Sequence, residues 1–149
     1  MTSEGKRLIL SALEEERISE GEIVARLEEE FARLIGARQA IVVNSGHSAL
    51  VVALSAARAL LGVRRVVTTS LTFISTVSAA IEAGLEVECV DVGDDLQLEP
   101  AQAASRLSQE GSVYLPVHLF GIPADLAPGR EAVLTVQDAC EALGTRGAG

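Results

Sequence analysis

The sequence predicts an α/β fold in which helices alternate with strands of a mostly parallel sheet. The chain has 149 residues, of which 48% are hydrophobic, so one domain can bury a core without disulfide bridges. From Gln39 onward, short apolar runs alternate with helix-like segments, and turns such as the one at residues 44–46 separate them. A sheet of this kind binds ligands at the carboxyl ends of its strands.

The first 36 residues are expected to form a helical arm ahead of a sheet domain at 37–149. Apolar residues recur there at helical spacing in two segments, at Leu8, Ile9, Ala12 and Leu13, and at Ile23, Leu27, Phe31 and Leu34. Ser19 is expected to cap the second helix, with Glu22 completing a capping box, and Gly36 is expected to end it. The acidic runs of this arm indicate solvated helix faces.

The remaining elements follow in alternation. Strands are expected at 40–43, 65–68, 86–90, 112–116 and 132–136, and helices at 47–61, at 73–83 and from about residue 100. The segment 125–130 is too short for a helix before the last strand, so a tight connection is expected there.

Composition and charge exclude several classes of protein. The formal net charge of −9 argues against nucleic-acid binding, and no apolar run has the length of a membrane span. The two cysteines, Cys89 and Cys140, form neither a disulfide framework nor, with His47 and His118, a metal site of familiar ligand spacing. A cytoplasmic protein without a membrane or nucleic-acid partner is therefore expected.

The turn at residues 44–48 (NSGHS) joins an expected strand to an expected helix. Free backbone N–H groups and the helix dipole favour an anion there, and Gly46 would allow it to approach the backbone closely. A plain junction capped by Ser45 explains the same residues equally well, so both interpretations stay open.

Three further segments place chemical groups after expected strands. Phe73 is available for stacking on a planar ring, although on this segment alone a core residue that begins a helix is the simpler interpretation. Asp138 follows the last strand and needs a partner to remain charged, such as a protonated heterocyclic nitrogen, unless it caps a helix. Glu141 lies three residues further on. His118 is most simply a hydrogen-bonded core or loop residue, and Cys140 a small buried residue.

In this order and spacing the segments resemble the DegT/StrS family of nucleotide-sugar aminotransferases, which are enzymes of fold type I dependent on pyridoxal 5′-phosphate (PLP). The resemblance spans residues 11–144. The segments that match the family are 18–21 (ISEG) with 27–32 (LEEEFA), 44–50 (NSGHSAL), 72–73 (TF), 117–125 (VHLFGIPAD) and 138–144 (DACEALG). His47 stands where the family usually has threonine.

The resemblance implies the three-layer large domain of the PLP transferases (aspartate aminotransferase-like), here incomplete, with PLP as cofactor. It implies that Gly46, His47 and Ser48 bind the phosphate, through the amides of His47 and Ser48 and the Ser48 hydroxyl. Phe73 would stack on the pyridine ring, and Asp138 would keep the pyridine nitrogen protonated, which makes the ring an electron sink. Glu141 would lie near the cofactor, where the family often has glutamine or histidine.

The resemblance also implies that the Schiff-base lysine of the family is absent from these residues. The family places its Schiff-base lysine well beyond the segment around Asp138, whereas the only lysine here is Lys6, in the helical arm. Without that lysine as tether and base, no catalytic residue is expected within the 149 residues, and the chain alone is expected not to turn over. It is then the N-terminal part of a longer or split enzyme, lacking the C-terminal strands and the small domain.

The same absence leaves the expected strand at 40–43 without a neighbour and the strand at 132–136 with a bare edge. A homodimer or a complementing C-terminal segment is therefore expected, with a nucleotide-sugar and an amino-acid donor as substrates of the complete enzyme. Three alternatives remain: a dehydratase of the same family with histidine in place of lysine, a non-catalytic cofactor-binding or dimerisation remnant, and, least favoured, an unrelated flavodoxin-like phosphate-binding domain.

Overall fold

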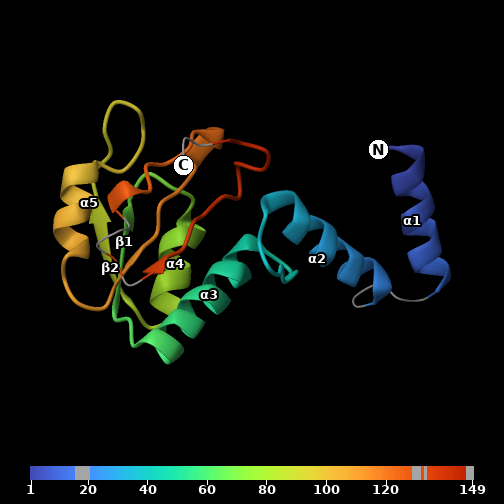
Figure 1. Ribbon diagram of the computed structural model, residues 1–149, viewed down its shortest axis with the longest axis horizontal. Coiled ribbons are helices and arrows are strands. Elements are labelled where there is room, and N and C mark those ends of the chain that lie inside the picture. Colours follow the sequence, from blue (N-terminus) through green and yellow to red (C-terminus); the bar gives the residue numbers. More distant parts are fainter. Residues whose placement is uncertain (16–20, 129–131, 133, 147–149) are drawn as a thin grey trace. The chain divides into compact units, whose positions relative to one another are not determined.

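The computed structural model describes residues 1–15, 21–128, 132 and 134–146. The chain divides into two compact units, Met1–Val43 and Asn44–Gly149 (Figure 1). The first unit is helical and the second contains the sheet. No helix in the described ranges combines the length and the apolar character that crossing a bilayer requires.

The helical unit contains the two expected helices, α1 (Ser3–Glu14) and α2 (Glu22–Ile35). Thr2 caps α1 by accepting the N–H of Gly5, and no residue of α1 is buried. Gly36 ends α2 in the left-handed conformation, at φ 73°, as its lack of a Cβ allows. Gly21 holds the N-cap position of α2 without a side-chain hydrogen bond, and the expected cap, Ser19, lies outside the described residues.

The strand expected at residues 40–43 is wrong for this structure, because these residues belong to no strand. A strand requires a neighbour whose backbone groups pair with its own, and none of the described strands pairs with this segment. The N–H of Val42 instead donates to the Glu28 carboxylate at 2.9 Å. The apolar pattern of residues 40–43 is therefore not enough to make a strand without a paired neighbour.

The second unit is built on four parallel strands in the order β2-β1-β3-β4. They are β1 (Arg65–Thr69), β2 (Glu86–Val90), β3 (Ser112–Tyr114) and β4 (Leu134–Thr135). β3 and β4 end earlier than expected, and residue 133 of the second expected strand lies outside the described residues. Hydrogen bonds continue past both strands, from the Leu115 N–H to the Val67 carbonyl and from the Val136 N–H to the Tyr114 carbonyl. Strand ends are the least certain part of any sequence-based expectation.

Helices cover both faces of this sheet, which confirms the expected three-layer α/β architecture (Figure 1). Alternation along the strands divides the core: Val66 packs with residues of α3 (Gly46–Leu61) and α4 (Ile74–Glu82), whereas Val67 packs toward α5 (Pro100–Leu107). Among the described residues between β3 and β4 there is no α-helix; 3₁₀ turns occur at η1 (Leu119–Gly121) and at residues 127–128. Residues 129–130 of the expected tight connection lie outside the described residues.

Candidate functional site

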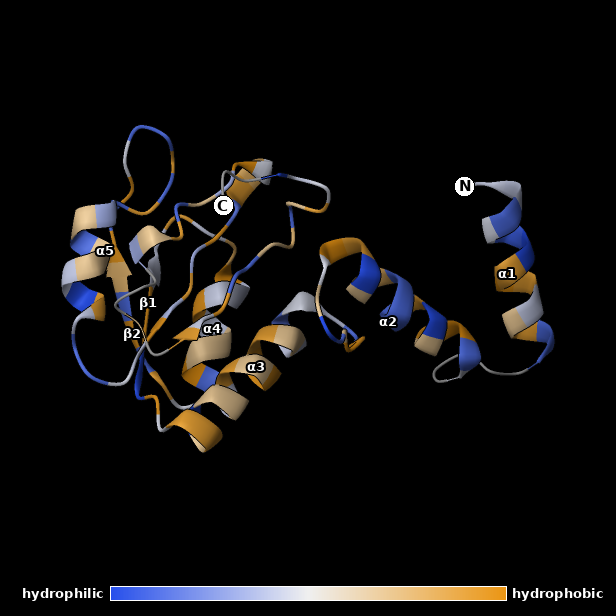
Figure 2. Cartoon of the chain, in the orientation of Figure 1, coloured by the Kyte–Doolittle hydropathy of each residue, from blue (hydrophilic) through white to orange (hydrophobic). Residues whose placement is uncertain are grey.

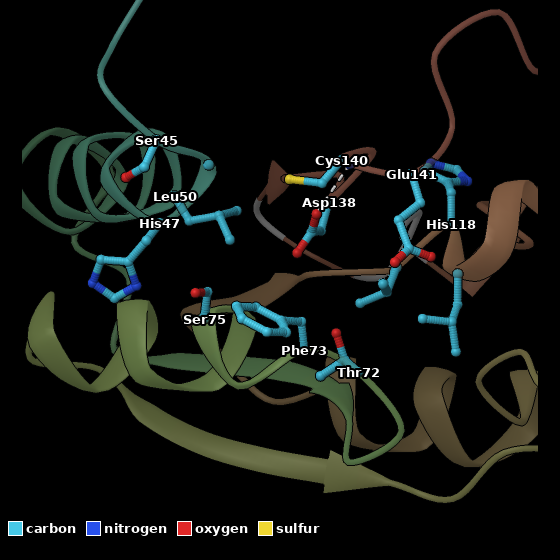
Figure 3. Close-up of a pocket in the computed structure, with 13 residues that line it drawn as sticks. Ser45, His47, Leu50, Thr72, Phe73, Ser75, His118, Asp138, Cys140 and Glu141 are labelled. Carbon is cyan, nitrogen blue, oxygen red and sulfur yellow. Dashed lines mark hydrogen bonds between the residues drawn. The ribbon is translucent and has the colours of Figure 1, made fainter.

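A cavity of about 310 Å³ lies where the carboxyl ends of the strands meet the start of α3. Its wall comes from four segments: residues 45–47 at the start of α3, 72–73 after β1, 117–119 after β3, and the segment after β4 that carries Asp138, Cys140 and Glu141 (Figure 3). Five of the six site residues expected from the sequence line it. The sixth, Ser48, does not.

The start of α3 explains the different position of Ser48. Ser45 is the N-cap, and its Oγ accepts the Ser48 N–H at 3.2 Å while its hydroxyl donates to the Ser48 Oγ at 3.1 Å. The backbone N–H of Ser48 and one acceptor site of its hydroxyl are therefore occupied by the Ser45 cap of the helix. The capped junction and the cavity wall coexist here, so the two interpretations of this turn do not exclude each other.

Gly46 is required by a close contact rather than by its backbone conformation. A Cβ built on Gly46 would lie 2.7 Å from the Sγ of Cys140, which is closer than real side chains approach. Cys140 comes from the segment after β4, so the glycine allows α3 to begin directly against that segment. Both residues line the cavity.

His47 contributes its position on the wall, but its imidazole is engaged elsewhere. Its Nε2 lies 3.0 Å from the Oε2 of Glu82, a residue of α4. The ring therefore links the start of α3 to the end of α4. The pair becomes an ion pair only when the imidazole is protonated.

Asp138 is the buried carboxylate of the site, with 8% of its surface exposed. Its backbone N–H donates to the Pro116 carbonyl at 2.9 Å, and its own carbonyl accepts the His118 N–H at 3.0 Å, so it extends the β3–β4 pairing. Its Oδ1 accepts the Cys140 N–H at 3.3 Å. The residues that follow form a turn, not a helix, so the helix-cap interpretation of Asp138 is wrong.

Thr76 is the polar neighbour of Asp138 that sequence reasoning did not single out. Its side chain is fully buried in α4, and its hydroxyl donates to the Asp138 Oδ2 at 2.7 Å. The Thr72 hydroxyl lies 2.7 Å from the same Thr76 oxygen. The spacing of four residues between two threonines at a helix start was the available signal, since it places both hydroxyls on one face.

Phe73 is not a core residue, because 72% of its surface is exposed. It occupies the N-cap position of α4, and its ring stands at the cavity beside Thr72 and Ser75 (Figure 3). The interpretation as a buried helix start is therefore wrong. An exposed aromatic face at a cavity wall remains available to a planar ligand.

Glu141 and His118 hold the backbone around the cavity. The Glu141 Oε2 accepts the Phe120 N–H at 2.7 Å, and Phe120 has a positive φ of 55°. The His118 Nδ1 accepts the Ala124 N–H at 3.0 Å, which leaves Nε2 to carry the proton and donate to Gln137 at 2.8 Å. His118 is thus hydrogen-bonded, as expected, and of the two expected places, core or loop, it lies in the loop after β3.

Cys140 is exposed, contrary to the expectation that it is buried. A hydrogen bond with Asp138 is the first cause that raises the pKa of its thiol to about 11, and partial burial adds to the effect. The thiol form therefore dominates near neutral pH, which does not suit a nucleophile. No group of three or more potential metal ligands occurs in the described part of the chain.

Comparisons with known proteins identify the family of this chain. The family model for "DegT/DnrJ/EryC1/StrS aminotransferase family" matches residues 1–149. The chain is 36% identical over 104 residues to the UDP-4-amino-4,6-dideoxy-N-acetyl-beta-L-altrosamine transaminase of Campylobacter jejuni, a match covering 68% of this chain and 27% of that protein. Across three curated relatives, the chain spans between 27% and 39% of their length.

Two solved structures show the same fold. The sugar aminotransferase CalS13 from Micromonospora echinospora superposes with a TM-score of 0.86 at 28% identity, covering 97% of this chain and 42% of that one. The E. coli GDP-4-keto-6-deoxy-D-mannose-3-dehydratase with bound hydrated PLP gives 0.83 at 22% identity, covering 97% and 40%. The second likeness shows the fold alone. The family match over residues 1–149 and the sugar aminotransferases among the relatives establish that this chain belongs to the DegT/DnrJ/EryC1/StrS aminotransferase family.

Proposed function

We propose that the unit Asn44–Gly149 forms the PLP-binding part of an enzyme that transfers an amino group from an amino acid to a nucleotide-linked keto-sugar. The observation that carries the proposal is the buried carboxylate of Asp138 in the wall of the cavity. Described residues place no lysine or arginine side chain on that wall. A carboxylate in such a place is suited to a cationic or protonated partner.

The residues fit PLP on two counts. Asp138 accepts hydrogen bonds from the Thr76 hydroxyl and the Cys140 N–H and also interacts with the Cys140 thiol, while an ionised carboxylate has about four acceptor sites, so capacity remains for a protonated ring nitrogen. Phe73 offers an exposed aromatic face for the ring. Bound PLP would supply an electron sink at the reacting carbon.

The phosphate is assigned to the start of α3. The Ser48 N–H is already held by Ser45, so the backbone N–H groups of Gly46 and His47 are the donors best placed to bind it, with the Ser48 hydroxyl beside them. The helix dipole adds attraction for the anion. Glu141, which holds the Phe120 N–H, would contribute negative charge near the ring rather than a direct bond to the phosphate.

The catalytic base is proposed to come from outside these 149 residues, because their only lysine, Lys6, lies in α1 of the helical unit. The chain alone would then bind the cofactor without turnover. β4 stands at an edge of the described sheet, which supports completion by a partner, either a second copy or a complementing segment. The two free cysteines suit a cytoplasmic, reducing location.

A dehydratase of the same family is the alternative, because the two reactions share one fold: the E. coli sugar dehydratase and the sugar aminotransferase CalS13 each match over 97% of the chain. The residues that hold PLP would be the same in both reactions. A non-catalytic cofactor-binding module is the third possibility. An assay of the completed enzyme with a nucleotide-linked keto-sugar and glutamate separates the first two, because only a transaminase yields an amino-sugar.

Equilibrium dialysis of the full chain with PLP tests the binding proposal directly. We expect saturable binding that Asp138→Asn weakens by at least about tenfold, because a charged hydrogen-bond acceptor is lost. Asp91→Asn is the matched control: Asp91 is exposed and caps only the Val92 N–H, so binding should not change. Absence of binding by the wild-type chain, or equal losses in both variants, would contradict the proposal.

A further inference from the structure

We propose that Thr76 is a positioning residue for Asp138, and that Thr72 and Thr76 form a two-hydroxyl hydrogen-bond relay that presents Asp138 to the cavity as an acceptor of fixed orientation. The geometry of the relay stands on the structure alone. Its consequence for PLP rests on the proposed function.

The relay is a continuous set of short contacts from the cavity wall into the core. Thr72 lines the cavity, and its hydroxyl lies 2.7 Å from the Thr76 Oγ1, which in turn lies 2.7 Å from the Asp138 Oδ2. Thr76 is fully buried and Asp138 is 8% exposed. Sixty-two positions separate Thr76 from Asp138 in the chain, so the contact joins the start of α4 to the end of the β4 segment.

The direction of each hydrogen bond follows from the chemistry of the groups. An ionised carboxylate only accepts, so the single hydroxyl proton of Thr76 must go to Asp138. The Thr76 oxygen is then an acceptor, and the proton in the first contact belongs to Thr72. With a carboxylate at Asp138, the hydrogen bonds therefore run from Thr72 through Thr76 to Asp138.

The relay also distinguishes the two oxygens of the Asp138 carboxylate. Oδ2 receives the short bond from Thr76, whereas Oδ1 receives the longer 3.3 Å bond from the Cys140 N–H. Two anchors on one carboxylate fix its rotation about χ2, which is otherwise broad. A ligand nitrogen in the cavity then meets an acceptor that is already oriented, and less conformational freedom is lost on binding.

If Thr76 had only a structural role, its hydrogen bond would do no more than give a buried hydroxyl a partner. Thr68 is a buried threonine of that kind and serves for comparison. Thr68 is as fully buried as Thr76, and its hydroxyl donates at 2.7 Å to the backbone carbonyl of Leu115. Thr68 lies on β1 and does not line the cavity. Replacing either threonine by valine removes one buried hydroxyl, but only Thr76→Val removes a partner of Asp138.

The test compares Thr76→Val, Thr76→Ser, Thr72→Val and Thr68→Val in the full chain. The first readout is the ¹³C resonance of the Asp138 carboxyl carbon without cofactor, assigned by its loss in Asp138→Asn. The second is the dissociation constant for PLP. We expect Thr76→Val to shift the resonance and to weaken PLP binding by about tenfold. Thr76→Ser should restore both, and Thr72→Val should change both in the same direction by less.

Thr68→Val should leave the Asp138 resonance and PLP binding unchanged, even if it lowers the melting temperature. A carboxyl resonance that does not move in Thr76→Val, or that moves equally in Thr68→Val, would overturn the relay. A shifted resonance with unchanged PLP binding would overturn its positioning role. If the wild-type chain binds no PLP, the proposed function fails while the ¹³C comparison still decides the relay. Should Thr76→Val not fold, Thr72→Val against Thr68→Val decides it in the same way.

Discussion

The two units of the chain contain similar amphipathic helices but differ in what those helices bury. In the helical unit, α1 has no buried residue and α2 buries only Ala32. In the sheet unit, α3 buries Leu50, Leu54 and Ala57 against the strands. Apolar residues line both α2 and α3 (Figure 2).

The difference shows that periodicity predicts a helix, whereas burial depends on a second layer to receive its apolar face. The sheet provides that layer for α3. On α2, by contrast, Leu27 is 51% exposed and Leu34 is 72% exposed. Three pairs of substitutions, one member in each unit, measure how far the contrast extends.

The largest contrast is expected between two leucines. Leu54→Ala removes a fully buried side chain from the core and should lower the free energy of unfolding by about 2–5 kcal/mol. Leu27→Ala removes a half-exposed side chain and should cost less than about 1 kcal/mol. Urea denaturation followed by circular dichroism measures both. Equal losses would show that α2 is packed as tightly as α3 in solution.

A smaller contrast is expected between two glycines. Gly46→Ala should destabilise the sheet unit by about 1–3 kcal/mol, because its Cβ would lie 2.7 Å from the Cys140 sulfur. Gly36→Ala meets no atom within 4 Å, so only its φ of 73° opposes the substitution, at about 1 kcal/mol.

Cys140→Ala should rescue Gly46→Ala and leave Gly36→Ala unchanged, as measured by denaturation of the double variants. If Cys140→Ala does not restore the stability of Gly46→Ala, the destabilisation arises from the start of the helix and not from the contact with the sulfur.

The smallest effects concern ionisation. The pKa of the Cys140 thiol is raised from about 9 to about 11, so the folded state favours the neutral thiol. This contribution to stability is complete below pH 9 and is lost as the pH rises through about 11.

In a Cys89→Ser background, the rate at which iodoacetamide alkylates Cys140 should be low at pH 8 and should rise with pH up to about 11. Asp138→Asn should accelerate alkylation at pH 8, since Asp138 is the first cause of the shift. Fast alkylation of the parent at pH 8 would contradict this assignment.

The matching pair in the helical unit is Glu4 and Arg7. The hydrogen bond from Arg7 lowers the pKa of the Glu4 carboxyl, so any stabilisation is present above the ordinary carboxyl pKa and is lost as the pH falls through the lowered value. Both side chains are exposed, and solvent screens the pair. Glu4→Gln should therefore leave the denaturation midpoint unchanged at pH 7, and a measurable loss would indicate that α1 is covered in solution.

Much of the sheet unit was predictable from local patterns. Alternation of apolar runs and helical segments identified β1 to β4 and α3 to α5, because burial on a sheet and on a helix leaves periods that are visible in the residues themselves. The same patterns failed at residues 40–43, where an apolar run has no partner strand among the described residues. Pairing is a property of two segments, and one segment does not reveal it.

The sequence by itself determined the alternating α/β order, the turn at Gly46, and the positions of Phe73 and Asp138 after their strands. Only the tertiary structure decided that Thr76 donates to Asp138, that His47 is held by Glu82, and that Gly46 lies against Cys140. Each of these contacts joins elements far apart in the chain. Their partners are set by which strands are neighbours in the sheet and by how α3 and α4 pack on it, and neither is encoded in the spacing of residues along one segment.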